Sequence, residues 1–326
     1  MFSNSHVLYF MIPPEIDFNE SKHGIPLMNY TITGGAGFIG SHLAKFLASR
    51  GDSVSVIDDL STGIMSNLDD VKNKITFHDA SILDLQKLEE IVKDSEGIFH
   101  HAALVSVPES YLKQREYHDV NVKGTENIFQ VAKKFHIKTV FASSSSVYGN
   151  TKIIPTPESE KRAPINPYGI TKLEAENLAI QYSKYCDIVG LRYYNVYGNA
   201  MTSTGSGVIT QFYQNVQKCA PPVIDGGGNQ LRDFVHIDDV VRATVSAMEK
   251  NTGSVFINIG SGTATSIVHL ADLFIKYSGM KVKPVFVNEK EGNVRASQAD
   301  ILLARKLLDW KPQTTLEDWI ESLFKS

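Results

Sequence analysis

The chain has 326 residues, of which 42% are hydrophobic and 21% charged, an ordinary balance for a globular protein with one large domain or two smaller ones. A formal net charge of −4 argues against a general nucleic-acid or membrane-surface binder, and no apolar run reaches the roughly 18 residues of a membrane helix. The two cysteines, Cys186 and Cys219, lack metal-ligand spacing, so we expect a reducing, cytoplasmic location with no disulfide and no metal site.

Segments typical of strands and helices alternate from residue 29 onward. We expect residues 1–27, which precede them, to form a poorly ordered extension. Apolar and β-branched runs predict strands at 30–33, 53–57, 75–78, 97–101, 138–143 and 188–191. Helical periodicity predicts helices at 38–50, 85–93, 122–135 and 168–185. This alternation predicts an α/β fold with a Rossmann-type, doubly wound parallel sheet covered by helices on both faces.

The alternation breaks after residue 198, where Gly, Ser and Thr dominate 198–207 and three glycines occupy 226–228. A further sheet strand is expected at 255–260. The tail from residue 266 carries two helix patterns and an extended segment at 282–287. We therefore expect a sheet domain built from 28–195 plus 237–262, and a smaller, interleaved C-terminal lobe built from 196–236 plus 263–326.

A glycine-rich segment, GGAGFIG at 34–40, joins the first expected strand to the first helix. Glycine lets a backbone approach a pyrophosphate closely, and the free amides of a helix N-terminus bind it. A tight turn without a ligand is the alternative, but the position between strand and helix is the context that a dinucleotide-binding motif requires. The predicted contacts are Gly34, Gly37, Phe38, Ile39 and Gly40.

Two acidic residues follow the next two strands, Asp58 and Asp79. An acidic side chain at position 58 can accept the hydroxyls of the adenosine ribose and repel a 2′-phosphate. Its neighbours Asp59, Leu60 and Ser61 supply no cation for that phosphate, so NAD is favoured over NADP. Asp79 can contact the adenine edge or be a solvated loop carboxylate, and both interpretations stay open.

Tyr168 and Lys172 are four residues apart in an expected helix, so they lie on one face. An ammonium beside a phenol stabilises the phenolate and can lower a pKa of about 10 toward neutrality. The pair alone is weak evidence, since the same spacing is common on solvated helices. It gains weight from the glycine-rich segment and from the serine run at 143–146 that precedes it.

Taken together, these motifs resemble those of extended short-chain dehydrogenases/reductases of the NAD-dependent epimerase/dehydratase family, and within it the UDP-glucose 4-epimerases. The resemblance runs from residue 28 to the C-terminus. Besides the motifs above it rests on Ala102, Ala103 and Asn121, and on the segments 143–149, 192–198, 228–239 and 292–300.

The resemblance implies that the sheet domain binds NAD and that Ala102, Ala103 and Asn121 also contact it. It implies that Tyr168 is the catalytic base and that Lys172 lowers its pKa and holds the nicotinamide ribose. Ser144, four residues before Tyr148, is implied to hydrogen-bond the sugar O4 and relay its proton. A Ser144 hydroxyl satisfied by backbone at a strand end remains the alternative.

The resemblance implies that the smaller lobe binds a nucleotide sugar, and we expect a UDP-hexose. The implied contacts are Asn195, Arg232, Arg295 and Ser297. Two guanidiniums can bind a diphosphate by forked hydrogen bonds, whereas each arginine alone is as readily a surface ion pair. The small Ser297 matches a gate position at which, by the resemblance, small residues admit N-acetylated sugars.

Ser145 and Ser146 stand where dehydratases of this family have an Asp-Glu pair and decarboxylases have a Glu. Without a carboxylate there, 4-epimerisation through a transient 4-keto sugar is favoured over elimination. Two alternatives stay open: another nucleotide-sugar enzyme (a reductase or an epimerase at a different carbon), and a non-catalytic NAD-binding regulator. Family members are commonly homodimers that pair helices like those at 122–135 and 168–185.

Overall fold

The computed structural model describes residues 27–199, 207–288 and 294–325. Residues 1–26 of the expected extension lie outside these ranges, as does most of the Gly/Ser/Thr-rich segment at 198–207. No helix among the described residues is long and apolar enough to cross a lipid bilayer.

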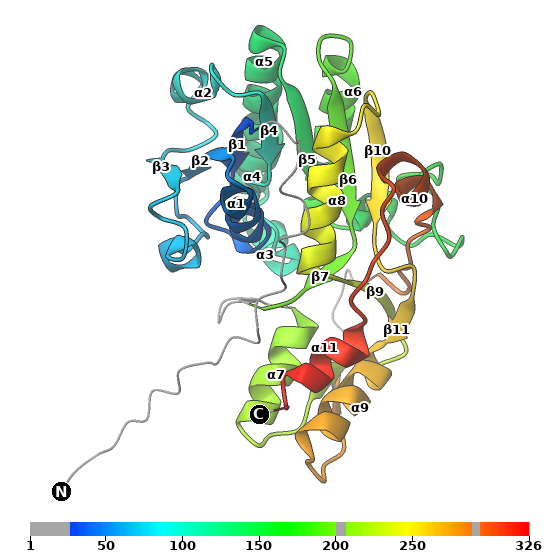
Figure 1. Cartoon of the computed structure of the whole chain (residues 1–326). Helices are drawn as coiled ribbons and strands as arrows, with labels where there is room; N and C mark the ends of the chain where they lie inside the picture. Colours follow the sequence, from blue (N-terminus) through cyan, green and yellow to red (C-terminus); the bar gives the residue numbers. More distant parts are fainter. Residues whose placement is uncertain (1–26, 200–206, 289–293, 326) are drawn as a thin grey trace, which may run out of the picture.

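A parallel sheet of seven strands forms the larger part of the described chain, in the order β10-β6-β5-β4-β1-β2-β3 (Figure 1). The chain order reverses between β1 and β4, which is the point where doubly wound sheets open a ligand crevice at their carboxyl ends. The expected Rossmann-type fold is therefore confirmed. The strands are β1 (Asn29–Thr33), β2 (Ser53–Asp58), β3 (Ile75–Asp79), β4 (Gly97–His100), β5 (Lys138–Ser144), β6 (Ile188–Tyr193) and β10 (Val255–Ile259).

Helices cover both faces of this sheet because each presents one apolar side to it. On one face lie α1 (Phe38–Arg50), α8 (Ile237–Glu249) and α10 (Leu302–Leu308), which share an apolar cluster with the sheet. On the other lie α2 (Leu85–Val92), α5 (Thr125–Phe135) and α6 (Pro167–Tyr182) (Figure 1). Core side chains such as Leu43 and Phe129 are fully buried, each worth about 1.5–3 kcal/mol.

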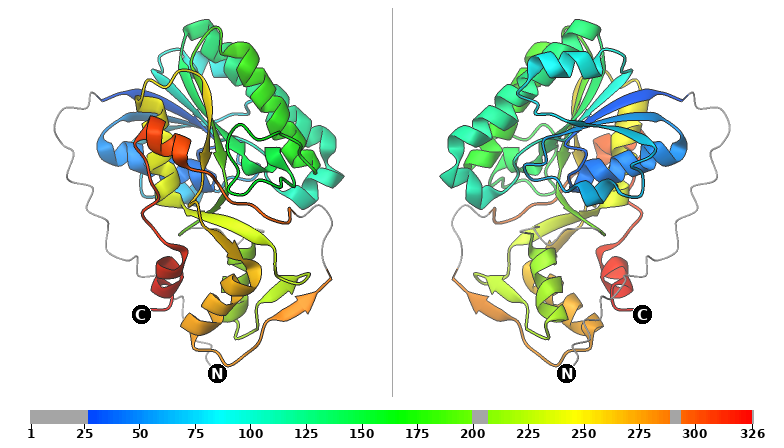
Figure 2. Two further views of the ribbon diagram at one scale, coloured as in Figure 1. Left: turned by 90° about the vertical axis from the view of Figure 1, so that its right-hand side faces the viewer. Right: turned by 90° about the vertical axis from the view of Figure 1, so that its left-hand side faces the viewer.

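A smaller lobe sits at the carboxyl ends of the sheet strands (Figure 2). Its two small sheets have the orders β11-β9-β7 and β12-β8. Its helices enclose an aromatic core that includes Phe212, Phe274 and Trp319. The elements are β7 (Asn195–Tyr197), α7 (Val208–Gln217), β8 (Val223–Asp225), β9 (Leu231–His236), β11 (Ala264–Ser266), α9 (Ile267–Ser278), β12 (Val285–Val287) and α11 (Leu316–Ser322).

The chain crosses between the two parts repeatedly, and buried polar side chains fix the crossings. Asp239, fully buried near the start of α8, accepts hydrogen bonds from the backbone amides of Gln313 and Thr314 in the segment that leads to α11. Asp233, fully buried on β9, accepts from the amides of Ser261, Gly262 and Ala299. These bonds join segments that lie far apart in the sequence.

Several short elements differ from the sequence-based expectation. The tail after residue 266 holds α9, α10 and α11 where two helices were expected, and its strand is only β12. Two short helices, α3 (Val107–Leu112) and α4 (Gln114–His118), precede a π-helical turn at Asp119–Gly124, so the helix expected at 122–135 continues one that begins earlier. Elements of five to seven residues span two turns of helix or fewer, which is too little for periodicity to reveal.

Candidate active site

The glycine-rich turn between β1 and α1 packs directly against the end of β4. Gly34 has a φ of +69°, and a Cβ there would lie 2.6 Å from the backbone nitrogen of Ala102. A Cβ on Gly40 would lie 2.2 Å from the carbonyl oxygen of Gly34. Neither position therefore tolerates a side chain, and the turn keeps its bare backbone in the crevice at the switch point.

A pocket opens beside this turn. Five of the expected cofactor contacts line it: Gly34, Gly37, Asp58, Ala102 and Ala103. The other expected contacts are not among its lining residues: Phe38, Ile39, Gly40, Asp79, Asn121, Tyr168 and Lys172. None of the described residues that line the pocket is Lys or Arg, so the pocket has no cation for a 2′-phosphate, as expected for NAD.

Asp58 combines burial with spare hydrogen-bonding capacity. Its Oδ2 accepts from the amide of Ala36 at 2.9 Å and its Oδ1 from the amide of Leu60 at 2.9 Å. Burial raises its pKa, against the effect of these two bonds. A carboxylate has about four acceptor positions, so two remain for the hydroxyls of a ribose. The bare turn and this carboxylate fit a dinucleotide.

Asn121 makes three hydrogen bonds inside the protein. Its Oδ1 accepts from the amide of Leu104 at 2.8 Å, and its Nδ2 donates to the Leu104 carbonyl at 2.9 Å and to Thr171 Oγ1 at 3.0 Å. The side chain therefore ties the segment after β4 to helix α6. The cofactor contact expected for Asn121 stays a prediction.

Helix α6 places Tyr168 and Lys172 on its first two turns. Asn166 caps the helix by accepting from the amide of Gly169 at 2.8 Å, and Pro167 occupies the first turn, where its missing N–H costs nothing. Lys172 is 6% exposed and its Nζ donates to the carbonyl oxygen of Ala142 on β5 at 2.9 Å. The ammonium lies 5.9 Å from the centre of the Tyr168 ring.

The pKa of the Tyr168 phenol is the main correction to the sequence-based expectation. We expected Lys172 to lower it, but burial raises the pKa of Tyr168 to about 12. Burial also lowers the pKa of Lys172 to about 8. Desolvation acts against the charged form of each group. In this structure Tyr168 keeps its proton.

Ser144 ends β5 and begins the short 3₁₀ turn Ser145–Tyr148. Its Oγ accepts from the amide of Ser146 at 3.2 Å, which is the backbone contact that the sequence left as the alternative. A side-chain hydrogen bond between Ser144 and Tyr168 nevertheless lowers the pKa of that phenol, against the effect of burial. The structure thus brings Ser144, Tyr168 and Lys172 together.

The expected substrate residues gather around β9. Leu231 exchanges backbone hydrogen bonds with Arg295 and Ser297, so these residues lie beside Arg232. Asn195 is exposed and starts β7, where it pairs in register with Phe234 of β9.

Arg232 and Arg295 differ in their surroundings. Burial lowers the pKa of Arg232, whose Nη1 donates to the carbonyl of Leu231 at 2.9 Å, and no carboxylate partner is found for it among the described residues. Arg295 is exposed. A partly buried guanidinium without a counter-ion carries a desolvation cost, and an anionic ligand offsets that cost.

Three residues in and around the site were not singled out from the sequence. Glu176 and Asp233 are fully buried carboxylates, and no local motif marks a carboxylate that acts by holding other segments in place. His101 lines the pocket and contacts the Tyr193 hydroxyl through Nε2 at 3.2 Å. Within the described ranges no group of His, Cys, Asp and Glu is arranged to hold a metal ion.

Known proteins resemble this chain in sequence over most of its length. Residues 30–260 match the model of the NAD dependent epimerase/dehydratase family. A putative UDP-glucose 4-epimerase from Methanocaldococcus jannaschii is 37% identical over 296 residues, which cover 89% of this chain and 95% of that protein. A UDP-N-acetyl-alpha-D-glucosaminuronate decarboxylase from Bacillus cytotoxicus is 36% identical over 248 residues, covering 74% of this chain and 77% of that protein.

Among solved structures, the UDP-N-acetylglucosamine 4-epimerase from Methanobrevibacter ruminantium M1, in complex with UDP-N-acetylmuramic acid, aligns with a TM-score of 0.87 at 31% identity. The alignment covers 92% of this chain and 98% of that one. Because the family model spans more than half of the chain and the relatives extend over most of its length, the chain belongs to the NAD dependent epimerase/dehydratase family.

Proposed function

We propose that the protein is a 4-epimerase of UDP-hexoses, acting on UDP-glucose and UDP-galactose and on the corresponding N-acetylhexosamine pair. The observation that carries the proposal is the convergence of Ser144, Tyr168 and Lys172 at the end of β5. None of the three lines the pocket, but His101 does, and after burial the charge of Lys172 contributes to the lowered pKa of that imidazole. Relatives whose names state 4-epimerisation of UDP-sugars support it.

We assign cofactor binding to the sheet domain, which we propose comprises 28–195 plus 237–262. The bare backbone at Gly34, Gly37 and Gly40 would receive the pyrophosphate, and Asp58 the adenosine ribose. NAD, when bound, supplies the nicotinamide that accepts and returns hydride at the sugar carbon, and its positive ring lowers the pKa of a neighbouring phenol.

The acid–base work is assigned to the three residues at the end of β5. Tyr168 accepts the proton of the sugar 4-hydroxyl and returns it to the 4-keto sugar after that sugar has turned over. Ser144 hydrogen-bonds the same oxygen and relays the proton. Lys172, held by the Ala142 carbonyl, keeps a positive charge beside the phenol at neutral pH, below its pKa of about 8. General-base assistance of this kind is worth about 10²–10⁴-fold in rate.

The smaller lobe, proposed as 196–236 plus 263–326, would hold the nucleotide. Arg232 and Arg295 flank one backbone bridge and can bind a diphosphate together, while Asn195 starts the neighbouring strand β7. Ser297 is tied to Leu231 by its own backbone amide at 3.0 Å, so its small side chain has a fixed place beside Arg232.

The decarboxylase relative raises decarboxylation of a nucleotide sugar as a second candidate reaction. The serines at 145 and 146 argue against it, because elimination and decarboxylation in this family use a carboxylate there. A reductase or an epimerase acting at a different carbon, and a non-catalytic NAD-binding regulator, are the remaining alternatives. A reductase would consume NADPH, so constant absorbance at 340 nm during complete turnover excludes it.

Replacing the proposed base gives the most direct kinetic test. We expect Tyr168→Phe to lower kcat by about 10²–10⁴-fold with the KM for UDP-glucose changed only a few-fold. Products from UDP-glucose, UDP-N-acetylglucosamine and UDP-glucuronate are resolved by chromatography. Tyr30→Phe, at the opposite end of the sheet, is the matched control and should keep full activity. Unchanged turnover by Tyr168→Phe would refute the assignment and favour the regulator.

Burial of Lys172 predicts a pH-dependent cost to stability. The folded pKa of about 8 lies below the ordinary value of 10.5, so between pH 8 and 10 the unfolded chain binds a proton that the folded protein has released. Stability contributed by this group therefore rises with pH, by about 1.4 kcal/mol per unit. The gain ends near pH 10, where ionisation of unfolded Tyr168 begins to act in the opposite direction.

We expect Lys172→Met to be more stable than wild type near pH 7 and to lose that advantage toward pH 10, as measured by urea unfolding at each pH. Lys87→Met, at an exposed position, is the control and should differ from wild type by a constant amount. A pH-independent difference for Lys172→Met would show that the ammonium is not desolvated.

The gate assignment predicts a change of substrate selectivity. Ser297→Tyr should remove activity on UDP-N-acetylglucosamine and retain activity on UDP-glucose, because the larger side chain occupies the space of the N-acetyl group. Ser297→Ala is the control and should act on both sugars. Rates with each sugar, measured by product chromatography, decide the matter. Equal loss for both substrates by the tyrosine variant would exclude Ser297 as the gate.

A homodimer is proposed from the exposed apolar residues on and around α6. Ile170 and Ile180 are 45% and 52% exposed, and Leu112 on the adjacent α3 is 87% exposed. Sedimentation equilibrium should give twice the mass of one chain, and Ile180→Glu should give a monomer. Val285→Glu, at a similarly exposed position on β12, should leave the mass unchanged. A monomeric wild type would exclude the dimer.

A further inference from the structure

A single buried carboxylate joins helix α6 to the end of strand β5. Glu176 is fully buried and lies one turn beyond Lys172 and two turns beyond Tyr168. Its carboxylate accepts from Ser143 Oγ at 2.6 Å, from Arg192 Nε and Nη2 at 2.8 Å each, and from Arg162 Nη1 at 3.0 Å. All four sites of a carboxylate are thereby used, so it has one orientation in which every partner is satisfied.

The partner on β5 is the neighbour of a proposed catalytic residue. Ser143 directly precedes Ser144, and Ala142 before it accepts the hydrogen bond from Lys172. Two successive turns of α6 are thus hydrogen-bonded to neighbouring residues of one strand end, through Lys172 to Ala142 and Glu176 to Ser143. A slip of the helix along the strand would disturb both bonds at once and move Tyr168 relative to Ser144.

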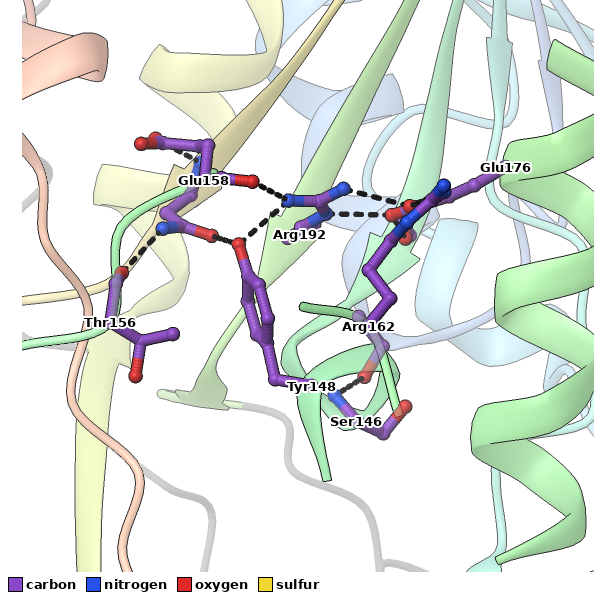
Figure 3. Close-up of polar contacts among 10 residues, drawn as sticks. Ser146, Tyr148, Thr156, Glu158, Arg162, Glu176 and Arg192 are labelled. Atoms are coloured by element: carbon purple, nitrogen blue, oxygen red, sulfur yellow. Dashed lines mark hydrogen bonds and ion pairs between the residues drawn. The ribbon is translucent and has the colours of Figure 1, made fainter. Parts of the chain in front are cut away.

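Arg192, on the neighbouring strand β6, is itself held from the side away from Glu176. Figure 3 shows its guanidinium between Glu176 and the hydroxyl of Tyr148, and Arg192 Nη1 donates to that hydroxyl at 2.7 Å and to the Glu158 carbonyl at 3.0 Å. Tyr148 in turn donates to Asn258 Oδ1 on β10 at 2.7 Å. The carboxylate of Glu176 is therefore anchored to a frame that spans β6 and β10.

Stability alone does not account for this arrangement. A buried ion pair is often no better than apolar side chains of the same volume, since desolvation offsets the attraction. Directional hydrogen bonds, in contrast, fix position more narrowly than apolar contacts do. We propose that Glu176 is a positioning residue, which acts through Ser143 to hold the Tyr168 and Lys172 face of α6 in register with Ser144. The proposal rests on the proposed function of Tyr168 and Ser144.

Removing Glu176 leaves the buried Arg192 guanidinium without its counter-ion and risks unfolding the protein, so the test removes only the link to β5. Ser143→Ala deletes one hydroxyl and keeps the ion pair. Ser95→Ala is the control, because the Ser95 hydroxyl also makes a 2.6 Å hydrogen bond, to Thr31 Oγ1, at the opposite end of the sheet. Urea unfolding checks that both variants lose similar stability.

Kinetics then separate positioning from stability. We expect Ser143→Ala to lower kcat by about tenfold or more, since misplacement of reacting groups by about 1 Å can cost about 100-fold. Its KM for UDP-glucose should stay within about twofold of wild type, because on this account Ser143 contacts neither substrate nor cofactor. Ser95→Ala should keep the wild-type kcat. Equal kcat for both variants, or a rise in KM alone for Ser143→Ala, would overturn the proposal.

A second readout needs no substrate and so stands apart from the proposed function. Amide hydrogen exchange followed by mass spectrometry should show faster exchange in the first half of α6 in Ser143→Ala than in wild type or Ser95→Ala. Unchanged exchange there refutes the link even if the protein proves not to be an epimerase. Faster exchange in a protein that shows no epimerase activity keeps the link and rejects only the proposed function.

Discussion

The first half of helix α6 places polar side chains against the end of β5. Lys172 and Glu176 are both buried there, and the cost of dehydrating them is met by specific partners: a backbone carbonyl for the ammonium, and two guanidiniums with a hydroxyl for the carboxylate. Burial raises the pKa of Tyr168 to about 12 and lowers the pKa of Lys172 to about 8, so it favours the neutral form of both side chains. Residues at functional sites commonly combine such desolvation with fixed partners, at a cost to stability.

The fold brings these polar side chains to the right place. Reversal of strand order between β1 and β4 opens the crevice, the bare turn at Gly34 forms one wall, and Asn121 ties the segment after β4 to α6. The smaller lobe is attached by crossings fixed at Asp233 and Asp239, so Arg232 and Ser297 have defined positions at the same end of the sheet.

Local patterns in the sequence predicted much of this, and their limits have physical causes. The spacing of Gly34 and Gly40 predicts a close approach of backbone, and the spacing of Tyr168 and Lys172 predicts one face of a helix. Both features depend on residues near in sequence. The sign of the Tyr168 pKa shift was wrong because it depends on burial by segments far away in the sequence. The hydrogen bonds of Asn121, the four bonds of Glu176 and the donors to Asp233 likewise come from other segments of the chain, which no local pattern reveals. Short helices such as α10 carry too little periodicity to be predicted.

The central claim is that C4 of the sugar exchanges hydride within a closed site while Tyr168 handles only the hydroxyl proton. The most direct measurement is epimerisation of UDP-glucose carrying deuterium at C4, followed by mass spectrometry of the UDP-galactose formed. The account predicts that the deuterium stays at C4, and that unlabelled substrate in heavy water gains none there. Loss of the label, or uptake from solvent at any ring carbon, would contradict it.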